Sequence, residues 1–147
     1  MNKYHYIESG LDNVFINGLE PVVDADGDQV IEIPFIAALH AEIARGIVMS
    51  KGAISGKELR FLRTEMGMTQ AQLSEKVGVD SQTVGRWERE ETPFDSNAEL
   101  VIRRIAGERL VDAFDESMER LVDRMKSNEA DPDITIEAEA DGYRLCA

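Results

Sequence analysis

Apolar and polar residues alternate in short runs through the first third of the chain, as is typical of strands followed by a helix. The runs Asn13–Ile16 and Leu19–Val23 flank the pair Asn17-Gly18, whose two residues tolerate the positive φ of a tight hairpin turn. A third strand is expected at Gln29–Ile33. A helix is expected to begin at Pro34, because apolar residues follow it at helical spacing: Phe35, Ile36, Leu39 and Ile43.

Capping residues mark four helix starts in the middle third. Ser55–Glu58 and Thr69–Gln72 are capping boxes, in which the Ser or Thr side chain accepts a hydrogen bond from the first turn and the Glu or Gln side chain reaches back. Asp80 or Ser81 is expected to cap a third helix. Ser96 is expected to cap a fourth, whose apolar positions would be Leu100, Val101 and Ile105.

The last third begins with an apolar stripe that predicts one long amphipathic helix. Its members are spaced four, four, three and four residues apart: Leu110, Phe114, Met118, Leu121 and Met125. Apolar and polar residues then alternate over Ile134–Ala140, which predicts a terminal strand. The partner of that strand stays open between the N-terminal hairpin and a second subunit.

Two short helices joined by a tight turn that contains glycine form the helix-turn-helix plan. Residues 69–88 fit this plan, reading TQAQLSEKVGVDSQTVGRWE, with Gly78 at the turn and Val84 and Trp87 on the inward side of the second helix. The segment resembles the phage-repressor (Xre/Cro/C1-type) family of helix-turn-helix transcriptional regulators, and the likeness spans residues 55–106. That family usually places a glycine two residues after the Trp-Glu pair, where this chain has Glu90.

A narrower resemblance rests on the opening YHYIESGLDNVFINGL, an intervening helix, the segment SGKELRFLR at Ser55–Arg63 and the later Trp87-Glu88 pair. Together these segments are similar to small bacterial regulators related to the MqsA-type antitoxins. Such relatives often bind zinc through N-terminal cysteines, but no cysteine precedes Cys146 here, so no zinc site is implied. The acidic turn Asp24–Asp28 also lacks the spacing of a calcium loop, since Gln29 and Phe35 stand where an EF-hand has its Gly and Glu.

These patterns predict a mainly α fold in three parts. Residues 1–49 are expected to form a small β-hairpin/helix unit for dimerisation or accessory contacts. Residues 50–109 resemble a five-helix, repressor-like helix-turn-helix domain that binds DNA. Residues 110–147 are expected to form an acidic amphipathic helix and a terminal strand.

Charge is distributed unevenly along the 147 residues, which carry a formal net charge of −13. Residues 1–49 hold two basic and eight acidic side chains, residues 50–109 ten of each, and residues 110–147 four basic and eleven acidic. The overall acidity excludes a protein that coats nucleic acid nonspecifically. Only the middle third can face a polyanion without strong repulsion.

Helix geometry and the resemblance together nominate residues that contact DNA. A recognition helix at residues 81–89 would place its outward N-terminal side chains against base edges in the major groove. Gln82 suits adenine and Arg86 suits guanine, with Ser81 beside them. Gly85 either lets the helix lie close to DNA or serves packing. The predicted contacts to the DNA backbone are Gln70 (by the family pattern), Thr83, Arg60, Arg63 and Arg89.

We therefore expect a sequence-specific, double-stranded DNA-binding transcriptional regulator that acts as a dimeric repressor of its own promoter. The neutral middle third and the two glutamates that follow Arg89 favour a dimer, in which two helices contribute to one site. The alternative is an antitoxin-like adaptor that binds a toxin-like protein through its N-terminal unit or its acidic C-terminal helix.

The sequence predicts neither an enzyme nor a membrane protein. No nucleophile–base pattern, phosphate-binding loop or metal-ligand spacing accompanies the acidic residues, so no catalytic residue, metal or cofactor is predicted. No apolar run approaches the roughly 20 residues of a membrane span. The single cysteine, Cys146, cannot form an internal disulfide, and we expect a cytoplasmic protein.

Overall fold

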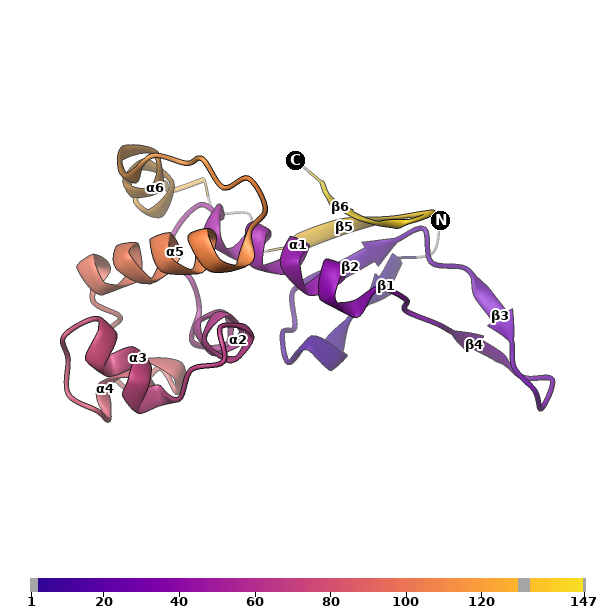
Figure 1. Cartoon of the computed structure of the whole chain (residues 1–147), viewed down its shortest axis with the longest axis horizontal. Helices are drawn as coiled ribbons and strands as arrows, with labels where there is room; N and C mark the ends of the chain where they lie inside the picture. The colour runs from indigo at the N-terminus through magenta and orange to yellow at the C-terminus, as the bar shows by residue number, and fades with distance from the viewer. Residues whose placement is uncertain (1–2, 130–132, 147) are drawn as a thin grey trace.

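A computed structural model of the chain describes residues 3–129 and 133–146. It combines a four-stranded sheet, a group of helices beside it, and a two-stranded arm that extends away from both (Figure 1). Helix α1 (Ile36–Val48) links the two larger parts, because it contacts β5 and β6 of the sheet as well as helices α2 and α5. The prediction of a helical protein with small β elements is confirmed in this coarse form.

The four-stranded sheet joins segments from opposite ends of the described chain. Its strands lie in the order β1 (Lys3–His5), β2 (Val14–Asn17), β5 (Ile134–Glu139) and β6 (Gly142–Leu145). The two central strands run parallel, with Ile16 opposite Ile136, and both outer pairs are antiparallel. The predicted terminal strand is confirmed as β5, and its partner is an N-terminal strand of the same chain.

The predicted hairpin around Asn17-Gly18 is wrong. Gly18 has the expected positive φ of 87°, but the chain leaves the sheet here and passes close to β5. A Cβ on Gly18 would lie 3.1 Å from the carbonyl oxygen of Ala138. The hairpin forms later, between β3 (Pro21–Val23) and β4 (Gln29–Ile31). Strand β2 instead gains a buried partner in β5, a long-range pairing that turn chemistry does not reveal.

Helix α1 begins two residues later than predicted. Phe35 precedes its first turn in a left-handed conformation with φ of 56°, so Pro34 lies outside the helix. Later in the helix the predicted buried face is confirmed, because Leu39 and Ile43 are fully buried. Phe35 and Ile36, which the same stripe would bury, are exposed because they precede the part of the helix that packs on the sheet.

Residues 50–109 contain the starts of four helices rather than the predicted five, and two of the four begin with the predicted capping boxes. Both boxes, at Ser55 and at Thr69, form with their reciprocal hydrogen bonds. Asp95 rather than Ser96 caps the fourth helix. That helix buries Ala98, Ile102 and Ala106 in place of the predicted Leu100, Val101 and Ile105. The four are α2 (Gly56–Glu65), α3 (Gln70–Lys76), α4 (Thr83–Glu88) and α5 (Ser96–Leu110).

The single long helix predicted from Leu110 to Met125 is wrong. Helix α5 ends at Leu110, the chain turns through Ala113 at φ of 52°, and α6 (Met118–Met125) starts anew behind a Ser117 cap. Phe114, a member of the predicted apolar stripe, lies in the connection between the two helices and packs against α5. A Cβ on Gly107 would lie only 2.5 Å from the Phe114 ring, so the glycine makes room for it.

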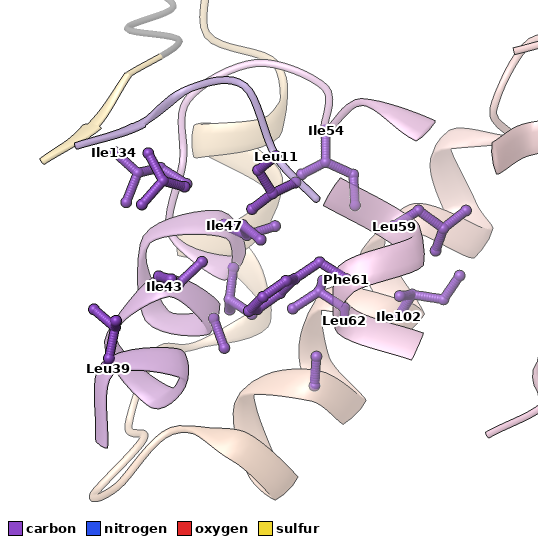
Figure 2. Close-up of a cluster of buried hydrophobic side chains, with 14 of the residues drawn as sticks. Leu11, Leu39, Ile43, Ile47, Ile54, Leu59, Phe61, Leu62, Ile102 and Ile134 are labelled. Atoms are coloured by element: carbon purple, nitrogen blue, oxygen red, sulfur yellow. The ribbon is translucent and has the colours of Figure 1, made fainter. Parts of the chain in front are cut away.

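One continuous core underlies the sheet and the helices. Figure 2 shows Leu11 and Ile134 from the sheet side beside α1, with Phe61, Leu62 and Ile102 from α2 and α5 in the same cluster. The boundaries predicted after residues 49 and 109 remain a prediction, and the core crosses both. The three segments therefore depend on one another for burial.

A buried ion pair fixes α5 to the connection between α1 and α2. Arg103 is completely inaccessible, and its guanidinium Nη2 lies 2.8 Å from a carboxylate oxygen of Glu99, which is 2% exposed. The same guanidinium donates to the carbonyl oxygens of Val48, Ser50 and Gly52, while Glu99 accepts from the backbone N–H of Ile54. Buried charges persist only when paired and hydrogen-bonded in this way. The sequence pattern placed neither residue in the core.

Candidate nucleic-acid interface

Helices α3 and α4 are joined by a tight turn held by its own hydrogen bonds. Gly78 adopts φ of 75°, and the N–H of Val79 donates to the carbonyl of Ser74 at 2.9 Å. The small, buried Ser74 also accepts from the N–H of Val84 at 3.4 Å. Val84 and Trp87 are buried, which confirms the predicted inward side of the second helix.

The second helix starts later than the predicted 81–89 range. It begins at Thr83, with Gln82 at its N-cap position and no side-chain cap. Asp80 stabilises the turn instead, because its Oδ1 accepts from the N–H of Gln82 at 2.9 Å. Helical geometry therefore holds Arg86, whereas Ser81 and Gln82 project from the preceding turn.

The residues predicted to contact bases form one exposed group. Ser81 and Gln82 are exposed, and Arg86 is partly exposed one helical turn later. The Nη2 of Arg86 donates to the Oε1 of Gln82 at 3.1 Å. The guanidinium is thereby held beside the amide, and each of these groups has the hydrogen-bonding geometry to read a base edge. Thr83, predicted at the DNA backbone, lies between them and is partly exposed.

Two of the predicted backbone contacts converge on Glu88. The Arg63 guanidinium reaches both oxygens of this carboxylate, at 2.6 and 3.1 Å, and Gln70 donates its amide to one of them at 3.0 Å. Arg63 also donates to the carbonyl of Met68. With Glu88 only 5% exposed and Arg63 14% exposed, this cluster ties α2, α3 and α4 together. The phosphate roles of Arg63 and Gln70 remain predictions, and both side chains position α4.

Gly85 serves close packing of α4 against the start of α3. A Cβ at this position would lie 2.9 Å from the amide oxygen of Gln70 and 3.2 Å from Nη1 of Arg89. Since both contacts are tighter than ordinary van der Waals separation, the glycine lets the Gln70 side chain reach Glu88. These contacts support the packing explanation for Gly85, and close approach of the helix to DNA at this glycine remains a prediction.

Part of the chain matches the model of a known protein family. A helix-turn-helix family model matches residues 59–98. The match begins within α2 and ends in the first turn of α5, so it contains α3, α4 and the turn between them. Comparisons with curated proteins and with solved structures found no significant match. The predicted helix-turn-helix is confirmed for this stretch, and such domains are typical of DNA-binding transcription regulators; the MqsA-like resemblance remains a prediction.

The helix-turn-helix ends in an unusual way. Glu90 adopts φ of 57°, the left-handed conformation that favours glycine, and the resemblance noted in the sequence places a glycine at this position. Its carboxylate accepts from the N–H of Gly56 at 3.0 Å. The helices meet closely here, since a Cβ on Gly56 would lie 2.3 Å from the carbonyl oxygen of Glu88. Glu90 therefore adds a hydrogen bond at the start of α2, so its negative charge stabilises that helix as well as repelling DNA.

Arg89 and Glu91 form an exposed ion pair just beyond α4. The Arg89 guanidinium donates to both Glu91 oxygens, and this hydrogen bonding lowers the pKa of Glu91 and raises that of Arg89. Both side chains are more than half exposed. Arg60, the remaining predicted backbone contact, is exposed and has no hydrogen bond or ion pair within the described part of the chain.

Replacing Glu91 with Gln is expected to tighten binding to every DNA sequence by roughly two- to fivefold, as the loss of one exposed pair implies. The change removes a negative charge and frees Arg89 for a phosphate. The slope of log affinity against log salt should steepen by about 0.9 for that contact. Titrations of labelled duplex at several salt concentrations measure both effects.

The matched control is Glu108→Gln, which removes the same charge from the exposed Arg104 pair on α5. An equal gain in both variants would show that net charge alone acts, with no role for Arg89 at the DNA backbone.

Glu88, Gly56 and Glu90 are the site residues that the sequence analysis missed. Glu88 had a signal, because it directly follows the inward Trp87 and lies between Arg86 and Arg89 at the end of α4. The contact between Gly56 and α4 had none, since it joins residues more than 30 positions apart. Only the three-dimensional arrangement brings these groups together.

Metal-binding and membrane-spanning features are absent from residues 3–129 and 133–146. No group of three or more His, Cys, Asp and Glu side chains there is placed to hold a metal ion. No helix in these ranges combines the length and the apolar character needed to cross a membrane. His40 instead bonds Tyr6 through one ring nitrogen and Glu65 through the other.

Proposed function

We propose that the protein is a sequence-specific, double-stranded DNA-binding transcriptional regulator that acts as a dimeric repressor of its own promoter. The observation that carries the proposal is the group formed by Ser81 and Gln82, exposed in the turn before α4, and the partly exposed Arg86 within that helix. Occupancy of the promoter by the dimer would exclude the transcription machinery. No catalytic residue is assigned.

The reading step follows from the geometry of α4. When the start of this helix enters the major groove, Arg86 forks onto O6 and N7 of guanine. Gln82 pairs its amide with adenine once it releases Arg86, and Ser81 donates to or accepts from a neighbouring edge. The Glu88 cluster holds α3 and α4 in one register, so the three side chains approach the bases as a unit.

Dimerisation is proposed because one copy offers little attraction for DNA. Helix α4 has only six residues, and residues 50–109 carry no net charge. Two copies related by a two-fold axis place two recognition helices in successive major grooves and double the number of contacts. A two-fold symmetric operator is the corresponding expectation for the DNA.

Replacing Arg86 with alanine is expected to cost about 1–3 kcal/mol of binding free energy on the cognate site. The variant should lose its preference between bases at only one position of each half-site, because Arg86 reads a single guanine. Competition binding against every single-base variant of the operator measures this. Arg120→Ala, an exposed arginine on α6, is the matched control. Equal weakening on cognate and scrambled DNA would contradict a base contact.

The test of the proposed function is selection of bound genomic fragments by the purified full-length protein. Wild type and the double variant Gln82→Ala/Arg86→Ala are compared at two salt concentrations. We expect wild type to enrich a two-fold symmetric site upstream of its own gene and the double variant to enrich none. Enrichment of the same site by both proteins, or of no site by either, would contradict reading by α4.

A further inference from the structure

The β3–β4 arm stands apart from the rest of the described structure. It forms its own two-stranded sheet and extends away from the body of the protein (Figure 1). Leu19 before it is buried and Ile33 after it packs on the core, so both ends of the arm are anchored. Between these anchors, no third strand pairs with it among the described residues.

The arm is preformed by the turn that joins its strands. One carboxylate oxygen of Asp24 accepts from the backbone N–H groups of Asp26 and Asp28, at 3.0 and 2.9 Å. Two backbone hydrogen bonds, Asp24 to Asp28 and Gly27 to Asp24, close the same turn. A two-stranded hairpin is only marginally stable in water, and these bonds reduce the ordering that a partner would have to impose.

One face of the arm is apolar and uncovered. The register pairs Pro21 with Ile31 and Val23 with Gln29, and side chains of these four residues share a face because neighbours on a strand alternate. Val23 is 68% exposed and Ile31 is 37% exposed. Two unpaired strand edges beside uncovered apolar residues are the features of a surface that accepts another strand.

The charge of the arm selects among possible occupants. Residues 19–36 contain five carboxylates and no Lys or Arg: Glu20, Asp24, Asp26, Asp28 and Glu32. A second copy pairing arm to arm would bring ten carboxylates together, and DNA would be repelled as strongly. A segment that carries Lys or Arg between its apolar residues complements both features.

We propose that the arm docks a basic, extended segment of another protein, which adds as a third strand along the free edge of β4. In an antiparallel pair alternate residues bond the partner strand, so the outward-facing backbone N–H groups of β4 are available to a third strand, whereas Pro21 removes one donor from β3. Backbone hydrogen bonds to the edge supply affinity, and alternate apolar side chains beside Ile31 supply specificity. This docking is independent of the proposed DNA binding.

The test uses the full-length protein and a panel of synthetic peptides in which Lys or Arg alternates with Val, Ile or Tyr. Each has a counterpart with Glu in place of the basic residues. We expect basic peptides to bind, to shift the amide resonances of Gln29–Ile31, and to weaken as salt rises. Ile31→Thr should lower their affinity about tenfold, equal to 1.4 kcal/mol. Val101→Thr, which changes a 40% exposed valine on α5, should leave it unchanged.

Three outcomes would overturn the docking proposal. Equal affinity for basic peptides and for their acidic counterparts would show that the negative charge of the arm does not select its partner. Resonance shifts confined to residues 110–146 would move the binding surface to the acidic C-terminal segment. Sedimentation showing a dimer that Ile31→Thr dissociates would assign the face to a second copy. Operator binding by Ile31→Thr, measured in parallel, separates this proposal from the DNA-binding one.

Discussion

Replacing Arg103 with alanine is expected to lower the free energy of unfolding by about 3–5 kcal/mol, because one partner of a buried ion pair is left without its counter-charge. Glu99 would remain buried on α5 with a single backbone donor, the N–H of Ile54. Three carbonyl groups of residues 48–52 would also lose their guanidinium donor. Urea titrations monitored by circular dichroism measure the change.

The neighbouring residue provides the control for Arg103. Arg104 pairs with Glu108 at the surface and also donates to the carbonyl of Glu116 at 2.8 Å, so Arg104→Ala should cost about 1–2 kcal/mol, less than Arg103→Ala. The double replacement Arg103→Met/Glu99→Leu should recover part of the loss, since it removes the orphaned charge. Equal destabilisation by the two single alanine variants would contradict the assignment of Arg103 to the core.

Replacing Glu88 with alanine is expected to cost about 3 kcal/mol of stability, near the lower end for a broken buried pair. The Arg63 guanidinium would lose both carboxylate contacts while only 14% exposed, and Gln70 would lose its acceptor. Because these contacts set the register of α3 against α4, affinity for cognate DNA should fall as well. Thermal unfolding and duplex titration on the same preparations measure the two effects.

Two variants separate charge from shape at this position. Glu88→Gln keeps an acceptor for Arg63 and should lose less stability than Glu88→Ala. Glu75→Ala, at an exposed position on α3, should change stability by less than about 0.5 kcal/mol. Full stability of Glu88→Ala together with normal operator binding would show that the cluster does not hold the two helices.

Local chemistry made most of the helical part of the fold predictable. The boxes at Ser55 and Thr69 act within a single turn, so four residues of sequence suffice to place each helix start. The turn at Gly78 and the inward Val84 and Trp87 follow from spacing in the same way. Errors arose where distant residues decide the outcome. Asn17-Gly18 has suitable turn chemistry, but β2 pairs with a strand more than 100 residues away.

The predicted phase of α5 failed because hydrophobicity alone defined its inner face. Arg103 and Glu99 are fully or almost fully buried, and a charged pair reads as surface in any polar–apolar pattern. The candidate site shows a related limit. Exposure of Gln82 and Arg86 followed from helix phase, whereas the carboxylate that engages Arg63 and Gln70 depends on the packing of three helices.

The parallel pairing of β2 with β5 has a consequence for the order of events during synthesis. All the helices, α1 to α6, are translated before β5 emerges, so they can fold on the ribosome while β2 still lacks its inner neighbour. High sequence separation between the paired strands makes closure of the sheet a slow, late step. A nascent chain stalled before residue 134 would therefore carry its helices on an open sheet and an incomplete core, because Ile134 and Ile136 are still missing, and it would be vulnerable to proteases and aggregation until translation resumes.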